Sequence, residues 1–394
     1  METTIAGRAD PLFTPLTDAF AENFAHHGEI GAALCVVLEG EMVVDLWGGM
    51  ADPGKGLPWR QDTLVPVFSS TKLATAILAH RLIDEGLLLP DVPVTRWWPE
   101  YAAGSPAKAA TTLQDMLAHR AGLPAFSAPL PRGAFLDWNT MVRRLEEAAP
   151  FWQPGTDHGY HMLTFGWLVG EPLRRAGGAG LDTLFRDRIA APLGLDLHIS
   201  LPESEDHRVA PILKGRIDRK NPPAPFYAAA FTDPDSLQGR AMLNTGRWDW
   251  NDPAYRRAEI GAAGAVGTAR ALARLVAPLT LGGGDLLSAE RVAALARPRS
   301  RGPDRLLLTE TAFSEGAMLA MHAPEGARDM DFPLAPGSFG HVGMGGSFVM
   351  ADPHRRLAMG YVMNRLGEGL LVNERGRRLL AALERALPRP EAAG

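Results

Sequence analysis

Cysteine, lysine and long apolar runs are all scarce in this sequence. The one cysteine, Cys35, rules out a disulfide within the chain and lies in an apolar run typical of a buried structural thiol. Five of the 40 basic residues are lysines, so the position of each lysine is informative. No apolar run reaches the roughly 18 residues of a membrane span, and the first residues lack a secretory pattern. The sequence therefore predicts a cytoplasmic protein without a membrane partner.

The sequence also has no excess of positive charge. A net charge of -5 and a pI near 6.1 argue against nucleic acid as a partner. The 394 residues, with 46% hydrophobic and 22% charged side chains, are typical of a globular protein of two domains, or of one domain with a large insertion. Oligomeric state is not indicated by any of these values.

Strand patterns occur near both ends of the chain. Residues 30–47 read as a hairpin around Glu39-Gly40-Glu41, and residues 347–363 read as a second hairpin. Residues 70–86 read as an amphipathic helix that ends at Gly86, and residues 375–387 read as a closing helix.

Between the two hairpins the pattern is mainly helical. Short helical stretches recur at residues 113–119, 139–148, 164–175, 181–190, 268–281 and 288–296, and residues 201–258 read as a long irregular region. We expect an α/β (α+β) domain from residues 1–95 and 255–394, interrupted by a mainly helical domain over residues 96–254. The active site is expected at their interface.

Several common functional motifs fail. Residues 49–55 match most of a phosphate loop, but Gly56 stands where Ser or Thr would hold magnesium. There is no G-x-S-x-G turn, and His158 and His161 have no further metal-ligand pattern around them. The sequence therefore predicts no metal and no cofactor.

Two S-x-x-K patterns are present. Ser105 precedes Pro106 in a polar stretch, as at a helix N-cap followed by proline, so Lys108 is read as structural. Ser69 instead follows an apolar run and opens the helix at residues 70–86, where positions i and i+3 share a face and bring Lys72 towards the serine.

A serine, an amine and a helix N-terminus in one turn suit acyl transfer. The difficulty is that a lysine of ordinary pKa, about 10.4, is almost entirely protonated at neutral pH. Burial or positive neighbours must lower that pKa before the amine can act as a base. From Ser69 and Lys72 alone, a catalytic turn and a capped helix start with a solvated lysine both stay open.

Two further stretches bear on that choice. Residues 154–161 place Tyr160 on a loop before an apolar helix, although a core aromatic would look the same. Residues 340–347 are glycine-rich and run into a strand, which permits close approach of backbone to a ligand or only a flexible strand entry.

Taken together, these stretches resemble the penicillin-recognising serine hydrolases, and most closely the class C β-lactamase-like carboxylesterases called family VIII. The resemblance covers nearly the whole chain. It is carried by residues 45–49 (DLWGG), 68–72 (FSSTK), 113–123 (LQDMLAHRAGL), the Tyr160 loop and residues 340–347 (GHVGMGGS).

The resemblance implies a role for each matching position. Ser69 would be the nucleophile, with Lys72 and Tyr160 as general base and acid. His341-Val342-Gly343 matches the K-T-G strand, which makes His341 and Gly343 substrate-binding residues. The oxyanion hole would be the backbone N–H groups of Ser69 and Met344. Trp152, in the tryptophan-rich region, is expected to wall an apolar pocket.

Two departures favour esters over β-lactams. Met162 stands where the Y-x-N motif has asparagine, and His341 replaces a permanent cation with a group mostly neutral at pH 7. The expected function is an EC 3.1.1-type carboxylesterase acting on small esters, with weak β-lactamase activity as an accessory. A β-lactamase or D-Ala peptidase, an acyltransferase, and a non-catalytic binding protein of the same fold remain open beside it.

Overall fold

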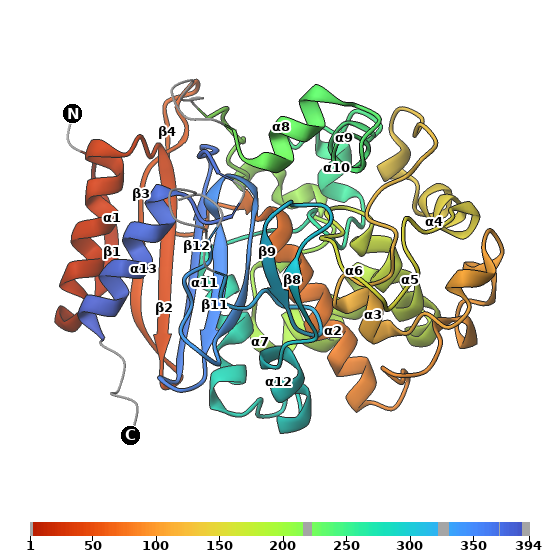
Figure 1. The fold of residues 1–394 in the computed structure, drawn as a ribbon. Coiled ribbons are helices and arrows are strands. Elements are labelled where there is room, and N and C mark those ends of the chain that lie inside the picture. The colour runs from red at the N-terminus through yellow and green to blue at the C-terminus, as the bar shows by residue number, and fades with distance from the viewer. Residues whose placement is uncertain (1–2, 216–222, 322–330, 370, 388–394) are drawn as a thin grey trace.

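A seven-stranded antiparallel sheet built from both ends of the chain lies at one side of the molecule (Figure 1). The computed structural model describes residues 3–215, 223–321, 331–369 and 371–387. The strand order is β1-β3-β2-β12-β11-β10, with β4 paired to β3. The strands are β1 (Ile5–Ala9), β2 (Gly31–Leu38), β3 (Glu41–Asp52), β4 (Leu57–Pro58), β10 (Phe339–Val342), β11 (Phe348–Asp352) and β12 (Leu357–Met363).

Both faces of the sheet are covered by helices. Because side chains alternate along a strand, Leu34 and Val36 of β2 pack with α1 (Thr14–His26) and α13 (Glu374–Ala386). Their neighbours Cys35 and Val37 join the other cluster, which includes α11 (Ala269–Val276). Gly360 of β12 lets α11 approach closely, since a Cβ there would lie 2.4 Å from Ala269 O.

The other side of the molecule is helical (Figure 1). Its central helix is α2 (Thr71–Asp84), which packs against α5 (Phe165–Gly177). The remaining helices are α3 (Leu113–Leu117), α4 (Trp138–Glu147), α6 (Leu181–Phe185), α7 (Ala191–Leu193), α8 (Pro225–Thr232), α9 (Leu237–Leu243), α10 (Pro253–Arg257) and α12 (Ala289–Ala296). The short strands are β5 (Val65–Pro66), β6 (Leu197–His198), β7 (Val266–Gly267), β8 (Ser300–Pro303) and β9 (Glu310–Phe313).

The expected fold class is confirmed, as are both hairpins and the helix after Ser69. The expectation of an irregular region over residues 201–258 is wrong in part, because α8, α9 and α10 lie within it. The strand β1 and the helix α1 were not expected. Residues 216–222 of that region lie outside the described residues.

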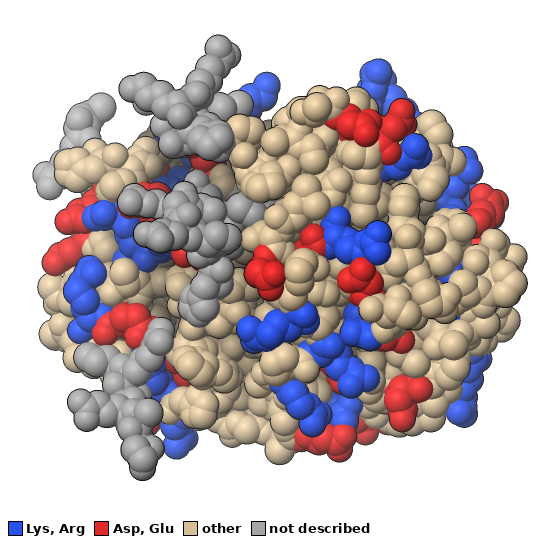
Figure 2. Space-filling model, viewed as in Figure 1, with Lys and Arg blue, Asp and Glu red and all other residues tan. Residues whose placement is uncertain are grey.

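One hydrophobic cluster joins the sheet to the helical side. Val37 of β2, Ile77 of α2 and Leu168 of α5 all belong to it. The division at residues 95 and 255 therefore stays a prediction, with no gap in the core to mark it. On the face shown in Figure 2, basic side chains lie among acidic ones. No helix in the described part of the chain is long and apolar enough to cross a membrane.

Candidate active site

Ser69 lies in a single 3-10 turn, Phe68–Ser70, that leads directly into α2. The turn is held by Val67 N, which donates to Ala265 O at 2.9 Å, and by Thr71 Oγ1, which donates to Phe68 O at 2.5 Å. Phe68 has φ +49°, a left-handed conformation that costs a residue with a Cβ about 1–2 kcal/mol. The fold thus maintains a strained backbone immediately before the half-buried Ser69.

Lys72 is completely buried one turn after Ser69. Its Nζ lies 3.1 Å from Ser69 Oγ, 2.6 Å from Met162 O and 2.9 Å from Ala262 O. The two carbonyl oxygens can only accept hydrogen bonds. A neutral amine would donate its two hydrogens to them, and its lone pair would then face the hydroxyl of Ser69. The arrangement therefore suits a lysine that removes a proton from Ser69.

The electrostatic environment of Lys72 favours that neutral form. Burial lowers the pKa of Lys72 well below its ordinary value of 10.5, and none of the described carboxylates forms an ion pair with it. This shift is in the direction that a lysine needs in order to act as a base, which was the condition that the sequence left open.

Tyr160 completes the group around Ser69. Its ring stacks on Phe313, with centroids 5.8 Å apart, and lies 4.9 Å from Lys72 Nζ. Burial raises the pKa of Tyr160 well above 10, while a hydrogen bond with Ser69 opposes that rise. Tyr160 is therefore a neutral phenol in the resting site, able to donate a proton but poorly suited to remove one.

Two backbone N–H groups lie on neighbouring segments of the site. Neither Ser69 N nor Met344 N donates a hydrogen bond to another described residue. The strand before Met344 lies close to the serine turn, since a Cβ on Gly343 would lie 2.5 Å from Val67 O and 3.3 Å from the Cβ of Phe68. Unpaired N–H groups of this kind are what a developing oxyanion requires.

The turn that carries Met344 is fixed through the carbonyl of Gly345. That oxygen accepts hydrogen bonds from Gly367 N at 2.9 Å, Asn373 Nδ2 at 2.7 Å and Arg375 Nη2 at 3.3 Å. Arg375 is itself held by the buried Glu29, with Nη1 to Oε1 at 2.5 Å. A buried ion pair thus supports the backbone of the candidate oxyanion hole.

His341 lies on β10 beside this group and is 1% exposed. Its Nδ1 contacts Val342 O at 2.8 Å, and its Nε2 has no partner among the described residues. Burial is the largest cause that lowers the pKa of His341 to about 3. His341 is therefore a neutral imidazole at pH 7, as expected from the sequence.

Trp152 supports the Tyr160 loop. Its Nε1 donates to Asp157 O at 3.1 Å, and a Cβ on Gly159 would lie 3.0 Å from its ring. The indole is 7% exposed. These contacts indicate a supporting role, and the expectation that Trp152 walls a substrate pocket stays a prediction. A different tryptophan, Trp250, meets Phe68 edge-to-face at 4.8 Å, next to the nucleophile turn.

The two histidines on the Tyr160 loop have other partners. His158 Nε2 contacts Thr311 Oγ1 at 3.0 Å. His161 Nδ1 contacts Gly159 O at 2.7 Å, while its Nε2 accepts from Leu123 N at 3.0 Å. Both ring nitrogens of His161 are thus occupied, and the described residues contain no group of three or more potential metal ligands.

The second S-x-x-K pattern is structural. Ser105 is the N-cap residue of a short 3-10 helix with Pro106 at its first position, although its side chain makes no capping hydrogen bond. Lys108 Nζ donates to Leu145 O at 2.8 Å and to Glu146 O at 2.7 Å. This lysine therefore satisfies carbonyls at the end of α4.

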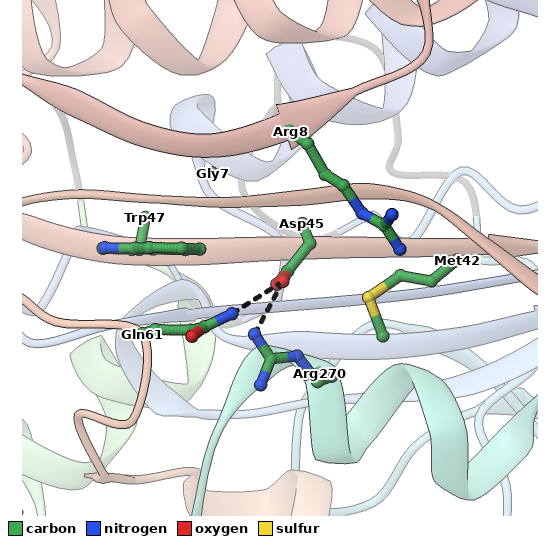
Figure 3. A pocket seen from close by; sticks show the side chains of 7 residues that line it. All are labelled: Gly7, Arg8, Met42, Asp45, Trp47, Gln61 and Arg270. Carbon is green, nitrogen blue, oxygen red and sulfur yellow. Dashed lines mark hydrogen bonds and ion pairs between the residues drawn. The ribbon is translucent and has the colours of Figure 1, made fainter.

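Residues 45–49 belong to a different part of the molecule. A surface pocket of about 480 Å³ lies beside them, lined by Gly7, Arg8, Met42, Asp45, Trp47, Gln61 and Arg270 (Figure 3). Asp45 Oδ2 lies 2.6 Å from Arg270 Nη2 and 3.5 Å from Gln61 Nε2, which ties β3 to α11. None of the lining residues touches Ser69, so this stretch holds the sheet against its helix.

Several groups around Ser69 could not be predicted from the sequence. The carbonyls of Met162 and Ala262 act through the backbone, so side-chain identity does not reveal them. His119, whose ring lies 4.9 Å from Tyr160, falls within the family-like stretch 113–123 but had no assigned role. Its φ of +60° is unusual for a residue other than glycine and is a constraint only the fold shows.

Comparisons with known proteins identify the family of the chain. A family model described as Beta-lactamase matches residues 16–384. The chain belongs to the beta-lactamase family. Within it, the chain is 36% identical over 380 residues to the Esterase/beta-lactamase LipL of Mycobacterium tuberculosis, covering 94% of this chain and 85% of that protein. It is 30% identical over 204 residues to Esterase EstB of Burkholderia gladioli, covering 48% and 51%.

Solved structures of this family have the same fold. A family VIII carboxylesterase matches with a TM-score of 0.85 at 36% identity, covering 98% of this chain and all 100% of that one. A penicillin-binding protein homologue from Caulobacter crescentus matches with a TM-score of 0.83 at 35% identity, covering 98% and 100%. The resemblance seen in the sequence is confirmed, and the chain is a hydrolase of the beta-lactamase family with esterase relatives.

Proposed function

We propose that this protein is a serine esterase of the EC 3.1.1 type that hydrolyses small carboxylic esters through an acyl-enzyme on Ser69. The observation that carries the proposal is the surroundings of Ser69 Oγ. A buried amine lies 3.1 Å away with its other contacts on carbonyls, and the ring of the buried Tyr160 lies 4.9 Å from that amine. A nucleophile, a base and a proton donor are thereby grouped together.

The reaction follows from this arrangement in two steps. Lys72 takes the proton of Ser69 as the serine oxygen bonds to the ester carbonyl, and the N–H groups of Ser69 and Met344 stabilise the oxyanion. Tyr160 then donates its proton to the leaving alcohol, and the proton held by Lys72 restores the phenol. In the second step water attacks the acyl-serine, and its proton passes through the Tyr160 hydroxyl to the neutral Lys72, which is the base. Lys72 then returns a proton to Ser69 Oγ as the acyl bond breaks, which releases the acid and regenerates Ser69.

The charge of the site supports an ester over a β-lactam as the substrate. A β-lactam carries a carboxylate, which the lysine of a K-T-G strand can pair with, whereas His341 is neutral because its pKa is lowered to about 3. Met162 also offers no side-chain amide. We expect a short-chain aryl ester to be turned over faster than a chromogenic cephalosporin; the reverse order would make β-lactam hydrolysis or D-Ala peptidase activity the main function.

An acyltransferase and a non-catalytic binding protein can each be distinguished from a hydrolase. An acyltransferase would divert the acyl group from water to an added alcohol or amine, which product analysis measures. A non-catalytic binding protein would leave the mass of the chain unchanged after treatment with a serine-directed phosphonate.

The deciding experiment combines phosphonate labelling with ester hydrolysis in the wild type, Ser69→Ala and Ser105→Ala. The Ser105→Ala variant is a matched control, because it alters the other S-x-x-K pattern, whose lysine contacts carbonyls of α4. We expect labelling and turnover to be lost in Ser69→Ala and unchanged in Ser105→Ala. A label on Ser105, or full activity in Ser69→Ala, would overturn the proposal.

A further inference from the structure

A buried carboxylate lies directly behind Tyr160. Asp304, in the turn between β8 and β9, is 2% exposed. Both of its oxygens accept from Tyr160 N, at 3.1 and 3.0 Å, and Oδ1 also accepts from Leu306 N at 2.8 Å and Leu307 N at 2.7 Å. None of the ion pairs among the described residues includes Asp304. The backbone N–H of Tyr160 is therefore bound by a carboxylate that forms no ion pair with any described residue.

Asp304, Thr311 and His158 form a chain of hydrogen bonds in which the donor of each bond can be assigned. Thr311 Oγ1 donates to Asp304 Oδ2 at 3.1 Å, which uses the one hydrogen of the hydroxyl. His158 Nε2, at 3.0 Å from the same Oγ1, must then be the donor in that contact. Every group that meets Asp304 is a donor, so the geometry fits an ionised carboxylate, although burial raises the pKa of Asp304.

The same turn holds the rest of the Tyr160 loop. Arg305 N donates to His158 O at 3.2 Å, and Arg305 Nη1 lies 3.0 Å from Asp157 Oδ2 on the outside. A Cβ on Gly159 would lie 3.2 Å from Leu306 N, so the two segments are in close contact. Among the described residues of this contact, Asp304 is the one that binds the backbone N–H of Tyr160.

We infer that Asp304 is a positioning residue for Tyr160: its carboxylate binds the backbone N–H of the tyrosine together with those of Leu306 and Leu307, and so holds the phenol where it can donate to the leaving alcohol. The inference rests on the proposed function. Asp304 does not touch Ser69 and acts only through Tyr160. No sequence pattern pointed to it.

Asp304 is the carboxylate among the titratable groups around Tyr160. The titratable groups that face the phenol or its loop are Lys72 from α2, His119 after α3, His341 from β10, His158 and His161 from the loop itself, and Asp304. Burial lowers the pKa of His119 well below 6.5 and is the largest cause that lowers that of His161 and His341 to about 3. These three imidazoles are neutral near pH 7. Burial is the largest cause of the raised pKa of Tyr160, and the charge of Asp304 adds to it.

The test is Asp304→Asn, which keeps the shape and removes the charge. The amide oxygen can still accept from the backbone N–H groups, and the amide nitrogen can donate to Thr311 Oγ1. We expect kcat for an aryl ester to fall about 10–100-fold with KM changed less than about threefold. The alkaline limb of the pH–kcat profile should move to lower pH, because the phenol then ionises more easily.

Asp157→Asn is the matched control, since it removes a carboxylate from the same loop, paired to the same turn but facing outwards. It should leave the alkaline limb in place. Wild-type kcat in Asp304→Asn, or a lower kcat with an unmoved alkaline limb, would overturn the inference, because a merely structural role does not move that limb.

Two further variants keep the test decisive. If Asp304→Asn does not fold, Thr311→Val removes one hydrogen-bond donor to the Asp304 carboxylate, which then protonates more easily. We expect a several-fold lower kcat, and the acid limb of the pH–kcat profile should move to higher pH. An unchanged profile there would overturn the inference. Tyr160→Phe separates the two proposals: near-normal turnover in it contradicts the proposed function, whereas its loss beside an unaffected Asp304→Asn contradicts only the role of Asp304.

Discussion

Lys72 Nζ lies 3.1 Å from Ser69 Oγ, and its other two contacts are backbone carbonyls. The amine is thus satisfied without any carboxylate, which would hold it in the charged form. The burial that lets Lys72 act as a base also means that protonating its amine destabilises the folded protein. Catalytic competence and stability are therefore linked through the protonation of this residue.

Replacing Lys72 by methionine should show that linkage. Because the pKa of Lys72 is lowered in the folded state, the unfolded chain binds more protons at every pH between that lowered value and 10.5. The wild type should therefore gain stability relative to Lys72→Met as pH rises through this window, by up to about 1.4 kcal/mol per pH unit. Chemical denaturation at several pH values from 6 to 9 measures the difference, and kcat should fall by about 10²–10⁴-fold.

The exposed Lys55 supplies the control for that comparison. Lys55→Met should change the free energy of unfolding by less than about 0.5 kcal/mol. A stability difference between wild type and Lys72→Met that is constant over the pH range would contradict the assigned state of Lys72.

Buried histidines should make the fold sensitive to acid. His80 of α2 is completely buried, its Nε2 contacts Glu315 O at 2.8 Å, and burial lowers its pKa to about 4. Between pH 6.5 and 4 the unfolded chain binds the proton more readily, so stability is lost as pH falls through this window. His80→Gln should remove up to about 3 kcal/mol of that loss, measured by urea denaturation at pH 7 and pH 4.5.

Activity gives the second readout for this variant. His80 makes no contact with Ser69, Lys72 or Tyr160, so kcat of His80→Gln at pH 7 should match the wild type. An acid sensitivity equal to that of the wild type would show that His80 is not the group responsible.

The sequence was sufficient to predict the family and the fold, because these depend on side-chain identity and order. The spacing of Ser69 and Lys72, the position of Tyr160 before a helix and the glycine-rich strand after His341 led to the correct family and fold. The two hairpins were visible because each strand is long enough to show an apolar pattern on both sides of a turn.

The remainder depends on contacts that the sequence does not contain. The partners of Lys72 are backbone carbonyls, and Asp304 meets Tyr160 across 144 residues of chain. The short helices α8 and α9 have eight and seven residues, too few for a clear helical period among prolines and glycines. Such features follow from tertiary packing, which local patterns do not encode.

The strand after His341 should tolerate no added methyl group at Gly343. A Cβ there would lie 2.2 Å from Ser347 Oγ and 2.5 Å from Val67 O, so the backbone that carries Met344 would have to shift. Gly343→Ala should therefore lower kcat by about 10²–10³-fold, the typical effect of losing one oxyanion donor. Gly54→Ala, at an exposed turn where the nearest atom is 3.3 Å away, is the control and should keep full activity. Normal turnover in Gly343→Ala would remove this strand from the oxyanion hole.

The pair of Glu29 and Arg375 should prove important for both stability and turnover. Glu29→Gln leaves the Arg375 guanidinium buried without its counter-charge, which typically costs about 3–5 kcal/mol in the free energy of unfolding. Because Arg375 also donates to Gly345 O, kcat of the folded fraction should fall while KM changes little. Glu22→Gln is the matched control. Glu22 pairs with Arg378, which lies on α13 like Arg375, but this pair is at the surface, where the loss of an ion pair costs about 0–1 kcal/mol. Equal losses of stability in the two variants would show that burial does not distinguish these pairs, and an unchanged kcat in Glu29→Gln would separate Arg375 from the oxyanion turn.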